Sequence, residues 1–126
     1  MSWTGSNRRQ FPRISYPCLI KLTSAEKNVR SILTHTENIG IGGVSVSVKK
    51  EIKLFTDVEL EIDLLDTTDH IKAAGKIVWS VRRKSTEEIK PMFYDAGIEF
   101  VNLQSRHKEH LRRTLDKVMK NGALVL

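Results

Sequence analysis

The sequence predicts a mainly β protein, a six-stranded antiparallel β-barrel followed by one C-terminal α-helix. Six successive segments show the two-residue alternation of apolar and polar side chains that is typical of strands. No segment with helical spacing separates them, which favours an antiparallel barrel or sandwich, and a barrel leaves no sheet edge exposed. After Asn102 the apolar residues change to helical spacing, which predicts the helix.

The first three expected strands differ in how clearly they alternate. Residues 14–23, ISYPCLIKLT, form the first, and Pro17 favours an edge or bulged strand because proline cannot donate to the ladder. Residues 29–38 form the second. Residues 43–49, GVSVSVK, form the third, with alternate valines on one face.

The other three expected strands alternate more strictly. Residues 57–66, DVELEIDLLD, place four apolar side chains on one face and three carboxylates on the other, and the DTTD sequence at their end predicts a hairpin turn. Residues 70–83 and 92–101 each present one apolar face, and Trp79 belongs to the first of these faces. We expect both faces to lie in the core.

The C-terminal segment has the spacing of an amphipathic helix, and Asn121-Gly122 is a typical helix end. We expect its apolar stripe to lie on the sheet or over one end of the barrel. The stripe consists of Leu103, His107, Leu111, Leu115 and Val118.

The composition is that of one domain. The chain has 126 residues, 40% of them hydrophobic, and a mean hydropathy of −0.30. We expect a single domain over residues 8–121, a flexible tail over 1–7 and an apolar tail over 122–126. No apolar run approaches the roughly 20 residues of a membrane helix, and the N-terminus lacks a signal-peptide core. These features predict a cytoplasmic protein without membrane insertion.

The net charge of +6 and the pI of about 9.6 favour an anionic partner. The single cysteine, Cys18, excludes an internal disulfide and a multi-cysteine zinc site. Because Cys18 lies in the apolar run YPCLIKL, we expect a buried structural thiol.

No residue pattern predicts catalysis, and we expect a non-enzyme with no catalytic residue, metal site or cofactor. His107 and His110 are three residues apart on the expected helix, but no acidic third ligand accompanies them, which favours a surface or core role. The glycines between Gly40 and Gly43 open a strand, and Ser45 breaks the G-x-G-x-x-G pattern, so the dinucleotide fingerprint is not met.

Two segments nevertheless suit a nucleotide. RRQFPR offers Arg8, Arg9 and Arg13, and arginine makes bidentate contacts with phosphate, stacks on bases and pairs with guanine O6 and N7. NIGIGG, which begins at Asn38, offers an amide side chain and a backbone that a ligand can approach closely. Taken alone, the arginine segment also fits a solvated basic tail, and the glycine segment also fits an ordinary turn. Their joint presence on a small β domain favours a binding site.

The order of these motifs resembles the PilZ domain family, the bacterial receptor modules for cyclic di-GMP. Arg9-Gln-Phe-Pro-Arg13 matches the R-x-x-x-R motif of that family, and Arg8 matches the arginine that commonly precedes it. The segments GKIVWSV (75–81) and YDAGIEFVNL (94–103) are also similar to the family.

The second family motif, [D/N]-x-S-x-x-G, is matched from Asn38 to Gly43 with one departure, because Gly40 stands where the family has serine. A hydroxyl lost from the ligand's surroundings lowers affinity by about 2- to 13-fold, since a hydrogen bond contributes about 0.5–1.5 kcal/mol.

The resemblance implies a PilZ-like split barrel that binds cyclic di-GMP and performs no chemistry. Arg9 and Arg13 would grip the phosphates and guanine edges with help from Arg8, Asn38 would meet a guanine edge, and Gly43 would keep the turn tight. The N-terminal arginine loop would become ordered on binding and signal to a protein partner, whose identity no residue here selects.

Two alternatives stay open. A degenerate PilZ-like module that does not bind the nucleotide and acts through protein contacts is motivated by Gly40 and by the apolar tail GALVL. A small basic barrel for nucleic acid is less favoured, because single-strand binders present exposed aromatic residues. Here Trp79, Tyr94 and Phe100 fall on expected core faces.

Overall fold

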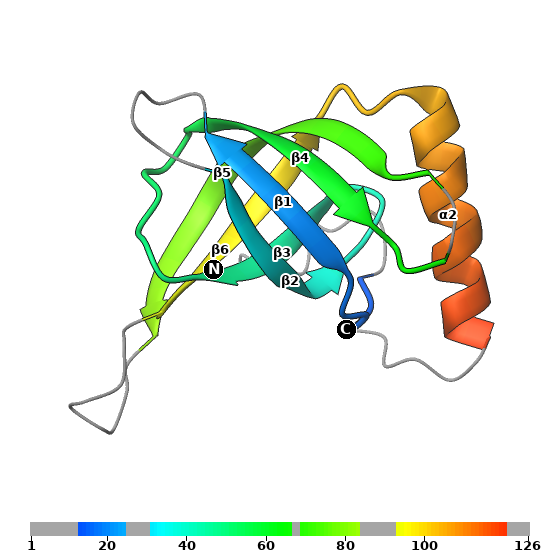
Figure 1. The fold of residues 1–126 in the computed structure, drawn as a ribbon, viewed down its shortest axis with the longest axis horizontal. Helices are drawn as coiled ribbons and strands as arrows, with labels where there is room; N and C mark the ends of the chain where they lie inside the picture. The colour runs from blue at the N-terminus through cyan, green and yellow to red at the C-terminus, as the bar shows by residue number, and fades with distance from the viewer. Residues whose placement is uncertain (1–12, 25–30, 67–68, 84–92, 121–126) are drawn as a thin grey trace, which may run out of the picture.

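A computed structural model describes residues 13–24, 31–66, 69–83 and 93–120, which form a β-barrel and one helix (Figure 1). The expected tails, 1–7 and 122–126, lie outside the described residues. The elements are β1 (Leu19–Ser24), β2 (Ile32–Ile39), β3 (Gly43–Val48), β4 (Asp57–Asp63), β5 (Ile71–Arg83), β6 (Phe93–Val101) and α2 (Ser105–Lys120).

The six strands close into a barrel in the order β1-β2-β3-β6-β5-β4, and every neighbouring pair is antiparallel. The prediction of a mainly β fold with a C-terminal helix is confirmed. Strand β4 shows why the pattern succeeds, because its apolar residues are buried inside the barrel while Glu59, Glu61 and Asp63 lie on the outside.

The first strand is shorter than expected, and it is not an edge strand. β1 starts at Leu19 and pairs with both β2 and β4, whereas Pro17 lies before it. The Thr36 hydroxyl accepts a hydrogen bond from the Cys18 amide (3.1 Å) and donates one to the Tyr16 carbonyl (2.7 Å). These side-chain bonds hold the segment around the proline to β2 without a regular ladder.

Cys18 is buried, which confirms the prediction of a buried thiol. Its burial raises the pKa of the thiol. The core also includes the inward residues of every strand and two leucines of the helix. At one point two strands approach so closely that a side chain does not fit. A Cβ on Gly43 of β3 would lie 2.3 Å from the carbonyl oxygen of Ile98 in β6.

Strand β5 corrects the prediction that Trp79 faces the core. A β-bulge falls between Ile77 and Trp79, because Ile77 pairs with Ile98 whereas Trp79 pairs with Gly97. The extra residue reverses the direction of the side chains that follow. Ile77 is therefore buried, while Trp79 lies on the outside of the barrel with 38% of its surface exposed.

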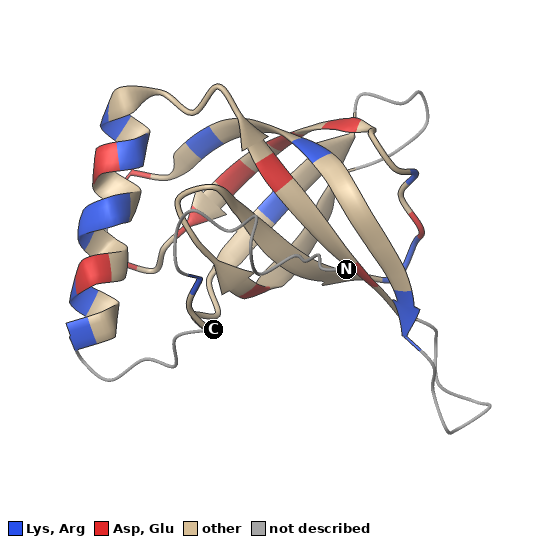
Figure 2. Ribbon diagram, turned by 180° about the vertical axis from the view of Figure 1, so that it is seen from behind, with Lys and Arg blue, Asp and Glu red and all other residues tan. Residues whose placement is uncertain are grey.

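Helix α2 lies across one end of the barrel, with Leu111 and Leu115 in the core as expected (Figure 1). Asp66, which follows β4, accepts a hydrogen bond from the Thr114 hydroxyl (3.2 Å) and lies 3.0 Å from His110 Nε2. Basic and acidic residues both occur along α2 (Figure 2), and the lysines and arginines of the helix are exposed. No helix in the described part of the chain is long and apolar enough to span a membrane.

Candidate functional site

The structure joins the two sequence motifs. The Nη1 group of Arg13 donates a hydrogen bond of 3.2 Å to the Oδ1 atom of Asn38, in a partly buried position. The next residue, Ile14, forms a bridge with Ile39, in which each amide donates to the other's carbonyl at 3.0 Å. The segment after the arginine motif is therefore fixed against the end of β2. Arg8 and Arg9 lie outside the described residues.

The glycine motif forms the turn between β2 and β3. The amide of Gly40 donates to the carbonyl of Gly43 at 2.9 Å, which closes the turn. The barrel itself requires glycine at position 43, because the carbonyl oxygen of Ile98 leaves no room for a Cβ there. Its presence alone therefore does not identify a ligand site.

A row of four residues crosses the outside of the barrel from Asn38. The strand registers pair Asn38 with Ser45, Ser45 with Gly97, and Gly97 with Trp79. Paired residues of neighbouring strands point to the same side of a sheet. The row thus runs over β2, β3, β6 and β5, and we call it the outer row.

Gly97 makes room for the indole at the far end of the outer row. A Cβ on Gly97 would lie 2.0 Å from Nε1 of Trp79, so the indole lies directly over the glycine. Ser45, between Asn38 and Gly97, is 4% exposed, and its hydroxyl has no hydrogen-bond partner among the described residues. Such an unpaired buried hydroxyl is rare in folded proteins.

A β-bulge lies at each end of the outer row. The bulge in β5 turns Trp79 outward, and the bulge in β2 falls between Thr36 and Asn38. Thr36 is buried, whereas Glu37 is exposed beside Asn38. Bulges re-aim side chains and occur often next to functional sites. Their position at both ends makes the outer row the best candidate for a binding surface.

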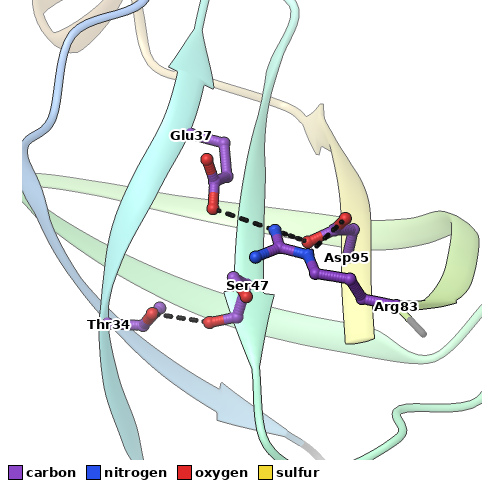
Figure 3. Close-up of polar contacts among 5 residues, drawn as sticks. All are labelled: Thr34, Glu37, Ser47, Arg83 and Asp95. Atoms are coloured by element: carbon purple, nitrogen blue, oxygen red, sulfur yellow. Dashed lines mark hydrogen bonds and ion pairs between the residues drawn. The ribbon is translucent and has the colours of Figure 1, made fainter. Parts of the chain in front are cut away.

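Three charged residues border the outer row (Figure 3). The Arg83 guanidinium at the end of β5 lies 2.5 Å from Asp95 Oδ1 and 3.4 Å from Glu37 Oε1. Its hydrogen bond to Asp95 raises the pKa of Arg83. Figure 3 also shows the Thr34 hydroxyl donating to the Ser47 carbonyl at 2.7 Å, which ties β2 to β3 beside this cluster.

A hollow of about 490 Å³ lies elsewhere, over the outside of β1, β4 and β5 beside the start of α2. Lys21, Lys72 and Arg106 line it together with Glu59 and Glu61. None of its lining residues belongs to the two motifs. Because both signs of charge line the hollow and neither motif reaches it, the outer row remains the stronger candidate.

Metal binding finds no support in the described residues, where no group of three His, Cys, Asp or Glu side chains could hold an ion. His107 and His110, the pair at helical spacing, contact the barrel instead. His107 Nδ1 lies 2.9 Å from the Lys72 carbonyl oxygen, and His110 contacts Asp66.

Sequence reasoning missed Trp79, Ser45, Glu37 and Arg83 as residues of this surface. Three of them follow bulges or lie in them, and a bulge changes the phase of a strand without altering its composition. The signal that was present is Gly97, a glycine in the middle of a strand, which often marks a close approach.

Comparison with known proteins gives one family and several similar folds. The profile of the PilZ domain family matches residues 7–117. No curated protein sequence matches the chain. The fold is similar to that of the Bacillus subtilis inhibitor of motility MotI/DgrA, with a TM-score of 0.74, 17% identity, and coverage of 91% of this chain and 52% of that one.

Two further similar structures contain cyclic di-GMP. The PilZ domain of Escherichia coli YcgR with cyclic di-GMP has a TM-score of 0.71 and 14% identity, with coverage of 90% of this chain and 93% of that one. The complex of MrkH from K. pneumonia with cyclic di-GMP has a TM-score of 0.73 and 14% identity, with coverage of 90% and 53%. The chain thus spans about half the length of MotI/DgrA and MrkH.

Proposed function

The chain belongs to the PilZ domain family, and from that premise we propose that it is a non-catalytic receptor for cyclic di-GMP. The ligand lies on the outside of the barrel, between the arginine motif and the outer row. The cyclic di-GMP bound to the similar folds of YcgR and MrkH supports this proposal.

The observation that carries the proposal is the hydrogen bond between Arg13 and Asn38. It places a guanidinium, a donor for phosphate or guanine, beside an amide that can pair with a base edge. Two motifs separated by 24 residues in the sequence thereby form one polar surface. Arg8 and Arg9 complete this surface in the proposal, as the residues that bring further positive charge to the phosphates.

Trp79 supplies the apolar part of the site. An exposed indole offers a flat surface on which a base can stack, and such stacking contributes about 1–3 kcal/mol per base. With Asn38 at one end of the outer row and Trp79 at the other, the ligand is held by polar contacts on one side and by stacking on the other.

Binding is proposed to order the arginine loop and so to signal to a protein partner. Ordering of a segment is a common way for a ligand without chemistry to change a surface. Slower amide hydrogen exchange in residues 8–12 after addition of cyclic di-GMP is the expected result. Unchanged exchange at saturating ligand would contradict this part of the proposal.

The test of the proposal is calorimetric titration with cyclic di-GMP at physiological salt, with cyclic di-AMP as the control ligand. We expect saturable binding of the guanine ligand. Arg13→Ala should weaken it about 10- to 150-fold, because a charge-assisted hydrogen bond contributes about 1.5–3 kcal/mol. Arg113→Ala, which removes an exposed arginine from α2, should leave the affinity unchanged.

Gly40 supports the second candidate, a PilZ domain that acts through protein contacts without the nucleotide. It lacks the serine hydroxyl of the family motif. Absence of binding by the wild-type chain at high protein concentration would favour this candidate. Binding to single-stranded nucleic acid with a steep salt dependence, rather than to the dinucleotide, would favour the third.

A further inference from the structure

The charged cluster of Arg83, Asp95 and Glu37 contributes little to stability by itself. Arg83 donates to Asp95 through Nε (3.3 Å) and Nη2 (2.5 Å), and its Nη2 also reaches Glu37 Oε1 at 3.4 Å (Figure 3). The side chains of Arg83 and Glu37 are about half exposed, at 49% and 50%. Exposed ion pairs of this kind contribute little, because water and salt screen them. Their position relative to the candidate site is more informative.

Both carboxylates lie close to the outer row. Asp95 is two residues from Gly97 on β6, so it faces the same side of the sheet at a distance of about 7 Å along the strand. Glu37 directly precedes Asn38, and the bulge in β2 leaves its side chain exposed there. Asp95 therefore lies within about one screening length, roughly 8 Å at physiological salt, of the row at Gly97, and Glu37 lies within the same distance of the row at Asn38.

A dianion on the outer row would be repelled by these two acids. Arg83 bridges both of them, so the three side chains together carry a net charge of −1 instead of −2. No other arginine or lysine has an ion pair with either carboxylate among the described residues.

We propose that Arg83 is a positioning residue that offsets half of the negative charge of Glu37 and Asp95 and thereby allows the outer row to accept an anionic ligand. This inference rests on the proposed binding of cyclic di-GMP. Arg83 acts through the two carboxylates and does not need to touch the ligand. Its Nη2 group contacts Asp95 at 2.5 Å and Glu37 at 3.4 Å, so one guanidinium holds both carboxylates.

The expected effect follows from the distance. If the lost Arg83 charge lies about 7 Å from a dianion in a medium with the dielectric constant of water, its loss weakens binding about 2-fold at 0.15 M salt and about 4-fold at 0.02 M salt, because screening falls as salt is removed. A change in packing would lower the affinity equally at both salt concentrations. The salt dependence therefore distinguishes a charge effect from a structural one.

The experiment is a calorimetric titration with cyclic di-GMP at both salt concentrations, using wild type, Arg83→Met, and a triple variant with Arg83→Met, Glu37→Gln and Asp95→Asn. Methionine keeps an unbranched stem without the charge. We expect Arg83→Met to show the stated losses and the triple variant, whose three side chains carry no charge, to bind at least as tightly as wild type at both salt concentrations. Denaturant unfolding of each variant verifies that it is folded.

A matched control exists on α2. Arg112 also bridges two carboxylates, at 2.6 Å from Glu109 and 3.5 Å from Asp116. Arg112→Met makes the same change in net charge and should leave the affinity within about 1.5-fold of wild type. An equal loss in both arginine variants would overturn the inference, because it would reflect net charge alone.

Two other outcomes also overturn it. If Arg83→Met leaves the affinity for cyclic di-GMP unchanged, the role of Arg83 is refuted. The same holds if the triple variant does not recover the loss. In both cases the receptor proposal stands. No binding by the wild-type chain would refute the receptor proposal, and this inference with it.

Discussion

The contact between Gly97 and Trp79 predicts that one added methyl group displaces the indole from the outer row. In Gly97→Ala the new Cβ would lie 2.0 Å from Nε1 and 2.3 Å from Cε2 of Trp79. Ordinary contact starts at 3.4 Å, so the indole has to move outward by about 1.4 Å. The ring is free to do so, because it lies on the outside of the barrel and is 38% exposed.

The cost follows from the surface that the indole loses. A large aromatic side chain buries about 150 Å² or more. If half of that contact is lost, the cost is about 2 kcal/mol at 25 cal/mol per Å². Alanine in place of glycine within a strand returns about 0.5–1 kcal/mol of backbone entropy. We expect a net destabilisation of about 1–1.5 kcal/mol.

A double-mutant cycle measures this effect by urea unfolding. In a Trp79→Ala background the obstacle is gone, so Gly97→Ala should stabilise the fold by about 0.5–1 kcal/mol, with the opposite sign. With Trp3 replaced by phenylalanine, Trp79 becomes the single tryptophan. Its emission should then shift to longer wavelength in Gly97→Ala.

Gly75→Ala is the matched control, because its Cβ would meet the Ile98 side chain inside the barrel at 2.6 Å and not the indole. It should lower stability without changing the emission of Trp79. Equal destabilisation by Gly97→Ala in both backgrounds would refute the assignment of the indole to this position.

Three further predictions concern other parts of the barrel. Gly43→Ala should lower the free energy of unfolding by about 1–3 kcal/mol in denaturant titrations, because the backbone oxygen of Ile98 cannot move aside; a smaller change would contradict the close approach of β3 and β6. Phe55 has a φ of 65°, which is strained for a residue other than glycine, and its side chain is 68% exposed. Phe55→Gly should therefore leave the free energy of unfolding unchanged or raise it by up to about 1 kcal/mol, and a lower value would contradict this. His70 lies 2.9 Å from Glu61, whose hydrogen bond raises the pKa of His70, while that of Glu61 is lowered. The pair therefore stabilises the fold fully between about pH 4.3 and 6.5, the ordinary pKa values of Glu and His, and the stabilisation is lost as pH rises through the folded pKa of His70. His70→Gln should flatten the pH dependence of unfolding midpoints measured from pH 5.5 to 8, and an unchanged slope would refute this.

The sequence predicted the fold well where one face of a strand is buried and the other is exposed. Strand β4 is the clearest case, because alternation of apolar and acidic residues leaves one possible orientation. Helix α2 was equally clear, since a change of period from two to 3.6 marks the boundary after Asn102. The prediction of an edge or bulged strand from Pro17 was less accurate, because β1 starts after the proline and pairs on both sides. The side chain of Thr36, distant in sequence, replaces the missing ladder bonds, and no local pattern shows this.

The candidate site was predicted in part. The prediction that Arg13 and Asn38 act together agrees with their hydrogen bond, but their role in binding stays a prediction. Trp79 could not be placed, because the apolar alternation from Ile71 continues through the bulge while the pairing shifts by one residue. The direction of a side chain after a bulge depends on the partner strand, and the sequence of β5 does not contain that information.

The two informative glycines have different meanings for function. Gly43 faces the backbone of Ile98, so a barrel of this register needs it whether or not a ligand binds. Gly97 faces the indole of Trp79, which supplies the three atoms nearest to an added Cβ. The glycine of the recognised motif is therefore tied to the fold, whereas Gly97, which belongs to no binding motif, is tied to the candidate surface. It follows that Gly97→Ala should lower ligand affinity through Trp79.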